Sequence, residues 1–398
     1  MLKSFIKLQL NRIKRLSWFL LAMVVRAVCK VNKRKIFCWS YSATKYACNP
    51  RAITEYILDV APNDYDIYWA FEKNVYTSSL PPRIHVVRRY NLSYLYALYT
   101  SKFVIYNMTN NIFDSMFVKK RNQKYIMTWH GDVAIKCIMN DAPSYSRILR
   151  KNAQWDSAMC DLMLSSNKQF TGLIRSAFGY RGEILERCTP RNDVFYNRKK
   201  ILTVYKKIRQ SMGFTSDTKI VLYAPTFRDN NVNLEPFCLD WDFIVPCFER
   251  MFGGKVEVLI RLHPNIANKI ENMQMIVNRP YIHDVSQAND ITEYLLAADA
   301  MISDYSSAMF DFSHFRRPCF MYVTDRKEYG HRRGFYLNLE QFPFPIAENK
   351  EKLKNNIEHF TIENYEKCLD AFDTEILGRD EDGRSCERLL EWMRLNSH

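Results

Sequence analysis

Short strand-like runs and longer helical runs alternate along almost the whole of this 398-residue chain. The strand-like runs are rich in β-branched and aromatic residues, and the helical runs have the spacing of one apolar face. Strands are expected over 36–40, 65–71, 84–88, 103–107, 125–129, 162–165 and 183–186, and, in a second series, over 220–223, 256–260, 300–303 and 319–323. Because parallel strands need a long crossover between them, usually a helix, the alternation predicts an α/β fold with doubly wound parallel sheets.

The chain is long enough for two domains that each bury a substantial core. A basic helix over 197–212, which Gly213 is expected to end, separates the two series of strands and places the domain boundary near residues 193–200. The predicted organisation is an N-terminal segment (1–34), two Rossmann-like domains (35–196 and 197–345) and C-terminal helices (346–398) that pack back across both domains.

Further helices are expected between the strands. Two of them cover 241–252 and 291–298. Another is expected to begin at Asn49 as its cap, with Pro50 in the first helical position, where a missing N–H costs nothing.

Composition and short motifs argue against several classes of protein. Hydrophobic residues make up 47% of the chain, which is typical of a folded globular protein. The eleven cysteines are scattered singly without a CxxC pair, which indicates reduced thiols in a cytosolic compartment rather than a disulfide framework or a structural zinc site. The sequence contains no GxxxxGK(S/T) loop and no GxGxxG turn between a strand and a helix, which argues against ATP hydrolysis and dinucleotide redox chemistry.

The positive charge of the chain, +14 in total, is prominent near the N-terminus, where no acidic residue precedes Glu55. On a helical projection one face carries Leu2, Phe5, Ile6, Leu10, Ile13, Leu16, Leu20 and Val24, flanked by Lys3, Lys7, Arg12, Lys14 and Arg15. The pattern predicts a basic amphipathic helix lying on an anionic membrane surface, with Trp18 and Phe19 as interfacial anchors. The apolar run over 16–25 is too short to span a bilayer, and an ordinary core helix with solvated lysines is the alternative. Nucleic acid is not an expected partner, because no zinc finger, RNP-type strand or basic repeat is present.

Polar clusters follow four of the expected strands. They cover 129–131, 224–228, 261–264 and 303–307. In open α/β sheets, ligands bind outside the carboxyl ends of the strands, so these clusters are expected to converge on one cleft.

The cluster at 303–307 has the composition of a phosphate site. Ser306 and Ser307 open a short helix, where hydroxyls, backbone N–H groups and the positive end of the helix dipole favour an anion. Asp304 falls at the end of the strand, and Asp311 lies far enough into the helix to reach a sugar or diol hydroxyl. A purely structural helix cap is the alternative.

Taken together, the motifs closely resemble those of the CDP-glycerol:poly(glycerophosphate) glycerophosphotransferase family of teichoic acid and capsule synthesis. The resemblance rests on the order and spacing of segments 48–52, 129–131, 189–193, 224–228, 261–264, 303–311 and 333–336, and it covers most of the chain after about residue 35. It implies the glycosyltransferase-B (GT-B) architecture, in which two Rossmann-like domains face each other across a cleft.

The resemblance also implies a reaction. A glycerol-phosphate or other polyol-phosphate unit would pass from CDP-glycerol or CDP-ribitol to a hydroxyl of a lipid-linked glycan or polyol-phosphate polymer, with release of CMP, at the cytoplasmic face of the cell membrane. No cofactor is required, and although Mg²⁺ can assist a diphosphate donor, no clear carboxylate cage is present. The alternatives are a glycosyltransferase that uses a nucleotide sugar and an inactive scaffold of the same fold.

Two histidines are candidate catalytic residues. His130 follows an expected strand and precedes Gly131, and an imidazole on such a turn can deprotonate an acceptor hydroxyl near neutral pH. His263 alternates with Arg261, so the two side chains point the same way and can neutralise the diphosphate and the departing CMP. The alternatives are a buried structural histidine and a strand-end pair bonded to a carboxylate.

The remaining candidates follow from the resemblance. Arg191 and the pair Pro225 and Thr226 match positions that contact the nucleotide diphosphate in the family, and Arg228 could serve the same phosphates. Further candidate contacts to the acceptor or to phosphate are Gly131, Lys136, Arg228 and Asp304. The family usually reads His-Gly-Thr-Pro-Leu-Lys at the His130 turn, whereas this chain has Asp132 and Val133 after the glycine and reaches its lysine only at Lys136, which puts the contacts of this loop in doubt.

Overall fold

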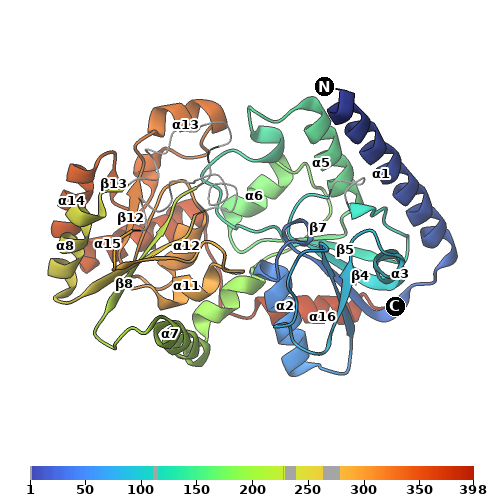
Figure 1. Ribbon diagram of the computed structural model, residues 1–398, viewed down its shortest axis with the longest axis horizontal. Helices are drawn as coiled ribbons and strands as arrows, with labels where there is room; N and C mark the ends of the chain where they lie inside the picture. Colours follow the sequence, from blue (N-terminus) through green and yellow to red (C-terminus); the bar gives the residue numbers. More distant parts are fainter. Residues whose placement is uncertain (1, 111–114, 227, 229–238, 263–277) are drawn as a thin grey trace. The chain divides into compact units, whose positions relative to one another are not determined.

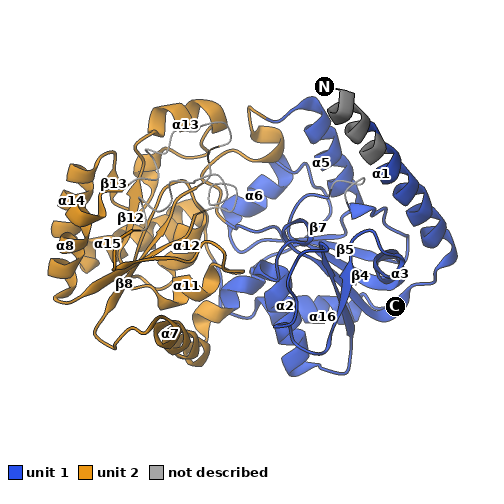
Figure 2. Ribbon diagram, viewed as in Figure 1, with its two compact units in different colours: residues 1–132, 145–193, 380–398 blue, residues 133–144, 194–379 orange. Residues whose placement is uncertain are grey.

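The computed structural model describes residues 2–110, 115–226, 228, 239–262 and 278–398 (Figure 1). The chain divides into two compact units (Figure 2). Unit 1 consists of residues 1–132, 145–193 and 380–398, and unit 2 consists of residues 133–144 and 194–379. The chain therefore passes between the units at four points, directly after Asp132, Ser144, Asp193 and Arg379.

Unit 1 is built on a seven-stranded parallel sheet in the order β3-β2-β1-β4-β5-β6-β7. Its strands are β1 (Asn32–Trp39), β2 (Asp66–Phe71), β3 (Ile84–Arg88), β4 (Ser101–Tyr106), β5 (Lys124–Met127), β6 (Leu162–Leu164) and β7 (Glu183–Leu185). The chain runs outward from β1 to β3 and then returns to the other side of β1 as β4. The order of strands thus reverses between β1 and β4, and such a switch point is where open α/β sheets bind ligands.

The helices of unit 1 are α1 (Leu2–Val28), α2 (Cys48–Val60), α3 (Leu92–Thr100), α5 (Arg147–Met159), α6 (Lys168–Ser176) and α16 (Ser385–Leu395), with 3-10 turns η1 (Tyr41–Ala43) and η3 (Pro190–Tyr196), the last of which continues into unit 2. The expected start of α2 is wrong by two residues. Ala47 is the N-cap and Asn49 lies in the first turn, without a capping hydrogen bond at Ala47. The Asn49 side chain is used elsewhere, as described below.

Unit 2 contains a six-stranded parallel sheet in the order β10-β9-β8-β11-β12-β13. Its strands are β8 (Lys219–Ala224), β9 (Val256–Ile260), β10 (Ile282–Asp284), β11 (Ala300–Ser303), β12 (Cys319–Tyr322) and β13 (Ile346–Ala347). The order reverses between β8 and β11, which places a second switch point there. All eleven expected strands are present, and the prediction of an α/β fold with parallel sheets is confirmed; β10 and β13, with three and two residues, were not expected.

The helices of unit 2 are α7 (Arg198–Met212), α8 (Trp241–Phe252), α11 (Thr292–Ala297), α12 (Ala308–Ser313), α13 (Arg326–Arg333), α14 (Lys350–Glu358) and α15 (Ile362–Ala371), with a 3-10 turn η2 (Met139–Asp141), a π-turn η6 (Phe372–Leu377) and a further 3-10 turn η5 (Leu339–Gln341). Gly213 ends α7 as expected, in the left-handed conformation with φ of 72°.

Both faces of the unit 2 sheet are buried, as a parallel sheet requires. Along β8, Val221 and Tyr223 belong to one apolar cluster, which also holds α8 and α14. Ile220 and Leu222 belong to the cluster on the opposite face, with α11 and α12. Successive strand residues therefore support opposite helix layers, and the carboxyl ends of the strands are held by a core on each side.

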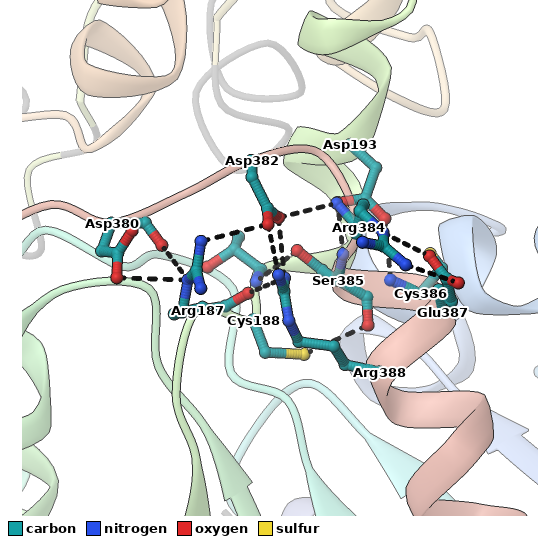
Figure 3. Close-up of polar contacts among 11 residues, drawn as sticks. Arg187, Cys188, Asp193, Asp380, Asp382, Arg384, Ser385, Cys386, Glu387 and Arg388 are labelled. Atoms are coloured by element: carbon teal, nitrogen blue, oxygen red, sulfur yellow. Dashed lines mark hydrogen bonds and ion pairs between the residues drawn. The ribbon is translucent and has the colours of Figure 1, made fainter.

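The C-terminal helix α16 belongs to unit 1, where it packs against α2. Its first two N–H groups, those of Ser385 and Cys386, donate to the Asp193 carboxylate at 2.9 and 2.7 Å. Ion pairs of Arg187 with Asp380 and Asp382, and of Arg388 with Asp382, fix the segment that leads into the helix (Figure 3). The hydrogen bonds from Arg388 lower the pKa of Asp382 to about 2.

The first helix, α1, lies against α3 and carries both buried and exposed apolar residues. Ala22 is fully buried, Trp18 meets the Tyr90 ring edge-on at 6.0 Å, and the Arg26 guanidinium donates to the carbonyls of Val118 and Lys119. The exposed apolar residues of α1 are Ile13, Leu16, Leu20, Val24 and Val28, with 53–72% of each exposed. No helix in the described part of the chain is long and apolar enough to cross a membrane.

Candidate active site

His130 lies just beyond the carboxyl end of β5, the strand next to β4, which borders the switch point of unit 1. Its Nδ1 is 2.8 Å from the carbonyl oxygen of Asn107, the residue that follows β4. A carbonyl can only accept, so this contact places the ring proton on Nδ1 and makes Nε2 the basic nitrogen. The Asn107 side chain in turn accepts from the Tyr41 N–H, beyond β1, at 2.9 Å. Groups following three neighbouring strands thus determine which nitrogen of His130 can take a proton.

The ring of His130 is also packed between aromatic neighbours. The Trp129 ring lies 4.3 Å away, centroid to centroid, and the Tyr41 ring 5.9 Å away. Trp129 has φ of 52°, a left-handed conformation that a bulky residue adopts only where its surroundings enforce it. Its ring meets that of Phe178 edge-on at 4.8 Å. The strained turn and the aromatic contacts together hold the imidazole half-buried.

Asn49 ties the His130 turn to the rest of unit 1. Its Nδ2 donates to the carbonyls of Thr128 and Trp129 at 3.0 and 3.1 Å, and its Oδ1 accepts from the Arg191 N–H at 2.9 Å. One buried amide therefore joins α2, the turn after β5 and η3. This role explains why Asn49 does not cap α2.

Asp132, two residues after His130, forms the buried centre of a second set of contacts. Its carboxylate accepts from Ser166 Oγ at 2.6 Å and from Asn192 Nδ2 at 3.4 Å, and it pairs with Arg191 Nη2 at 3.8 Å. The side chains of Arg191 and Asp132 are only 6% and 4% exposed. In the sequence, Asp132 stood out only as a departure from the family pattern, and Ser166 and Asn192 were not among the predicted site residues.

Arg191 thus lies in unit 1, with its guanidinium beside Asp132 under the His130 turn. The other described residues predicted to bind the donor lie in unit 2. The role of Arg191 as a donor ligand stays a prediction, while its ion pair with Asp132 is observed.

Gly131 is the last residue before Asp132, where the chain leaves unit 1, and Lys136 belongs to unit 2. Lys136 forms an isolated antiparallel bridge with Phe335, and the Cys137 N–H donates to the Gly334 carbonyl at 3.1 Å. Gly334 has φ of 69°, and a Cβ at this position would come within 3.1 Å of Cys137 Sγ. The lysine is therefore held on the segment 333–336 that the motif analysis singled out.

In unit 2, Pro225, Thr226, Asp304, Ser306 and Ser307 gather at the switch point between β8 and β11. Asp304 Oδ1 accepts from the N–H groups of Thr226 and Tyr305 at 2.8 and 2.6 Å, so one carboxylate joins the two strand ends. Among the described residues, the buried Thr226 Oγ1 has no hydrogen-bond partner. A buried hydroxyl in that state is costly unless a ligand completes it.

The two serines open α12, a helix of six residues. Ser306 Oγ accepts from the Ala308 N–H at 3.3 Å, and Ser307 is the N-cap but makes no capping hydrogen bond through its side chain. Asp311 lies in the first turn and is 5% exposed. The structure therefore brings the two serines, Thr226 and Asp304 together, and it places Asp311 in the adjoining interior.

Arg261 follows β9, and its guanidinium donates to the carbonyls of Val285 and Ala288 at 3.1 and 3.0 Å. Its expected partner, His263, lies outside the described residues. Arg228, two residues beyond Thr226, is buried between Asp304 and Asp325, a carboxylate that sequence analysis did not identify. No group of three or more His, Cys, Asp or Glu residues placed to hold a metal ion occurs in the described ranges.

Residues 20–394 match the CDP-glycerol:poly(glycerophosphate) glycerophosphotransferase family. The chain belongs to this family. The match covers the strands, both switch points and every predicted site residue, and it confirms the resemblance inferred from the motifs. The enzyme class is thus that of a glycerophosphotransferase with CDP-glycerol and poly(glycerophosphate) as its two substrates, as the family's description states.

Individual relatives agree with this assignment. The chain is 31% identical over 332 residues to a teichoic acid poly(glycerol phosphate) polymerase of Bacillus spizizenii, covering 81% of this chain and 82% of the relative. It is 26% identical over 398 residues to a teichoic acid glycerol-phosphate transferase of Staphylococcus aureus, covering 96% and 98%. The poly(glycerol phosphate) polymerases of Staphylococcus epidermidis and Bacillus subtilis are longer, and the chain spans only about half of each (48% and 45%).

Among solved structures, the wall teichoic acid polymerase TagF superposes with a TM-score of 0.80 at 26% identity, covering 98% of this chain and 98% of that one. A variant of TagF soaked with CDPG superposes with a TM-score of 0.79. A UDP-N-acetylglucosamine 2-epimerase of Listeria monocytogenes superposes with a TM-score of 0.53 at 14% identity, which reflects the shared fold alone.

Proposed function

We propose that this protein transfers glycerol-phosphate from CDP-glycerol to a hydroxyl of a teichoic acid acceptor, with His130 as the general base. The observation that carries the proposal is the hydrogen bond between His130 Nδ1 and the Asn107 carbonyl, which makes Nε2 the basic nitrogen for the proton of an acceptor hydroxyl. The family match supplies the donor and the class of acceptor.

The reaction balances without a covalent enzyme intermediate. The acceptor oxygen attacks the phosphorus next to glycerol, the bond from that phosphorus to the bridging oxygen of CMP breaks, and the acceptor proton passes to His130. His263, with Arg261, is proposed to neutralise the charge that develops on the departing CMP. Positioning and charge neutralisation account for most of the barrier reduction in such a transfer.

The donor would bind at the switch point of unit 2. Thr226, Ser306 and Ser307 offer hydroxyl groups, and Pro225 shapes the turn that carries Thr226. Thr226 Oγ1, which has no hydrogen-bond partner in the described part of the chain, is the strongest indication that a polar ligand completes this site. Asp311 is proposed to accept from a glycerol hydroxyl, and Arg191, Gly131 and Lys136 stay as predicted contacts of the donor or acceptor.

CDP-glycerol is preferred over CDP-ribitol because the 31%-identical relatives are glycerol phosphate polymerases, whereas those named for ribitol phosphate are 24–26% identical. The test is to incubate the purified protein and a teichoic acid acceptor with CDP-glycerol, CDP-ribitol or a UDP-sugar, and to measure nucleotide release. CMP release that is fastest with CDP-glycerol supports the proposal. Turnover of the UDP-sugar alone would show a conventional glycosyltransferase, and no turnover of any donor would favour an inactive scaffold.

We also propose that α1 attaches the protein to the cytoplasmic face of the membrane, where a lipid-linked acceptor would be held. The exposed apolar residues Ile13, Leu16, Leu20, Val24 and Val28 recur every three or four positions, so they form one stripe along the helix. Lys14 and Arg15 are exposed beside it, and their charge favours anionic lipids.

The membrane proposal is tested with vesicles that contain anionic lipid. Replacing Leu16, Leu20 and Val24 by serine is expected to abolish sedimentation with the vesicles without lowering the melting temperature, because these side chains are already exposed. The matched control replaces Ile148 by serine, an apolar residue of unit 1 that is 73% exposed on α5. Equal vesicle binding by the α1 variant and the control would contradict the proposal.

A further inference from the structure

Arg228 is buried at the switch point of unit 2 in contact with two carboxylates. Its Nη1 is 2.9 Å from Asp304 Oδ2, and its Nε and Nη2 donate to the two oxygens of Asp325 at 2.6 and 3.0 Å. The side chains of Arg228, Asp304 and Asp325 are 7%, 3% and 16% exposed. This is a bidentate pair with a third charge attached, and it joins the turns that follow β8, β11 and β12.

Two tyrosine rings lie beside the guanidinium. It lies 5.1 Å from the ring centroid of Tyr305 and 4.7 Å from that of Tyr329, and the two rings stack on each other at 3.9 Å. The Tyr305 hydroxyl donates to Asp325 Oδ1 at 3.2 Å. Burial disfavours the charged form of Arg228, but Asp304 and Asp325 more than offset this and raise its pKa. The arginine is a fixed cation inside the protein.

The same group fixes both peptide units around Thr226. The Thr226 N–H donates to Asp304 at 2.8 Å, and the Thr226 carbonyl accepts from Arg228 Nη1 at 2.6 Å. Asp304 and Arg228 are themselves ion-paired, so the backbone of Thr226 is held from both sides by one bonded assembly. Its Oγ1 is the buried hydroxyl that lacks a partner among the described residues.

We infer that Arg228 and Asp325 are positioning residues that hold Thr226 for the donor, and that Arg228 does not itself bind the diphosphate. The inference rests on the proposed donor site in unit 2. Each polar edge of the Arg228 guanidinium already faces a carboxylate or the Thr226 carbonyl, so contact with a phosphate would require this assembly to break. Removing one partner from such a buried assembly leaves a charge uncompensated.

The two roles of Arg228 predict opposite results for Asp325→Asn, measured as the dissociation constant for CDP-glycerol by calorimetry. If Arg228 is a positioning residue, Asp325→Asn and Arg228→Lys each weaken donor binding about tenfold, and the double variant is no weaker than either single one, because all three loosen the same turn. If Arg228 binds phosphate, Asp325→Asn frees it and donor binding stays equal or strengthens, which would overturn the inference.

Two further variants distinguish a specific effect on donor binding from a general loss of folding. Tyr305→Phe removes only the hydroxyl that donates to Asp325, and it is expected to weaken CDP-glycerol binding by about two- to threefold with a nearly unchanged melting temperature. Glu358→Gln is the matched control, since it alters an exposed carboxylate paired with Arg250 at 2.7 Å in the same unit, and it should leave binding unchanged. Unchanged binding in both Tyr305→Phe and Asp325→Asn would contradict the inference.

Hydrogen exchange on the protein without donor separates this inference from the proposed function. Asp325→Asn should speed exchange at the N–H groups of Thr226 and Tyr305, which donate to Asp304. Exchange at Gly253, the C-cap of α8 in the same unit, should not change. Unchanged exchange at Thr226 and Tyr305 would overturn the positioning role whatever the donor. Failure of the unmutated protein to bind any CDP-polyol would instead overturn the proposed function, and with it the donor role of Thr226.

Discussion

The His130 turn of unit 1 and the Thr226 turn of unit 2 are fixed by different kinds of contact. The imidazole of His130 is oriented by an uncharged carbonyl and by aromatic rings. The backbone of Thr226 is held by a buried arginine and its carboxylate partners. A general base must gain and lose a proton, and a neutral partner selects its tautomer without placing a charge beside it. A diphosphate site has no such requirement, so fixed charges can stiffen it.

Each turn is nevertheless next to a buried arginine–carboxylate pair. Arg191 and Asp132 lie under the His130 turn, and Arg228 and Asp304 lie under the Thr226 turn. In each pair the side chains are less than 10% exposed, so the charges stabilise the loop and are not presented to solvent. The buried arginine–carboxylate pair beside each turn therefore supports the loop.

The largest effect is expected at His130, where a substitution should lower the transfer rate without weakening donor binding in unit 2. His130→Ala should lower the rate of CMP release by at least about 100-fold, because general-base catalysis contributes roughly 10²- to 10⁴-fold. Binding of CDP-glycerol, measured by calorimetry, should stay within about twofold of the unmutated protein, since the base acts on the acceptor. The control is His359→Ala, because the Nδ1 of His359 also contacts a backbone carbonyl, at 2.9 Å from Asn355 O. Equal activity of the two variants would remove His130 from the mechanism.

Breaking the buried pair under the His130 turn should come next. Asp132→Ala leaves the Arg191 guanidinium buried without its carboxylate, and the free energy of unfolding should fall by about 3 kcal/mol. We expect kcat to fall about tenfold with little change in KM for CDP-glycerol, because the loosened loop carries the base and not the donor. Asp132→Asn, which keeps an acceptor for the Ser166 hydroxyl, should recover part of both losses. A change confined to the KM for CDP-glycerol would show that Arg191 acts on the donor instead.

In unit 2, Ser306→Ala and Arg261→Ala should weaken donor binding, each by about tenfold, because hydrogen bonds to a charged ligand contribute roughly 1.5–3 kcal/mol. Calorimetry with CDP-glycerol measures the effect directly. Ser313→Ala, at the other end of α12, is the control, since its hydroxyl donates to the Phe310 carbonyl. Unaltered affinity in both Ser306→Ala and Arg261→Ala would mean that the diphosphate binds elsewhere.

The smallest effect on transfer is expected at Asp156, a buried carboxylate of unit 1 that pairs with no arginine in the described contacts. Burial raises its pKa to about 7, and hydrogen bonds from the Asn110 N–H and Tyr125 offset this only in part. Because the folded pKa exceeds the unfolded one, the group stabilises the fold most below about pH 4, and this contribution is lost as the pH rises toward 7.

Asp156→Asn should therefore be more stable than the unmutated protein at pH 8, by on the order of 3 kcal/mol, and should lose the decline in stability between about pH 4 and 7. Urea unfolding at a series of pH values measures this. Transfer rates at pH 7 should be unchanged, in contrast to Asp132→Asn. A pH profile of unfolding that the substitution does not alter would show that folding does not raise the pKa of Asp156.

Much of the fold followed from the sequence because the eleven expected strands alternate with helical runs along most of the chain. The exceptions, β10 and β13, have three and two residues and are stabilised by pairing with β9 and β12 rather than by their own composition. The assignment of 133–144 to unit 2 and of 380–398 to unit 1 depends on contacts between distant segments. The sequence pattern contains no signal for such exchanges.

The residues of the candidate site could be predicted where polar residue types directly follow an expected strand. His130, Thr226, Asp304, Ser306 and Ser307 all follow parallel strands of their own units, as expected. Their partners could not be predicted, because the Asn107 carbonyl and the Asp325 carboxylate belong to loops 23 and 97 residues away from the groups they contact. The motif showed Arg228 as a candidate phosphate ligand, and only the structure shows the carboxylates on both sides of it.

The most direct test of the central claim is mass spectrometry of the product formed when the unmutated protein acts on a teichoic acid acceptor with CDP-glycerol. The account predicts that the acceptor gains the mass of one or more glycerol-phosphate residues while CMP accumulates in equal number. It also predicts that His130→Ala yields no such product. An acceptor that gains a sugar, or that is unchanged while CDP-glycerol is bound and His130 is intact, would contradict it.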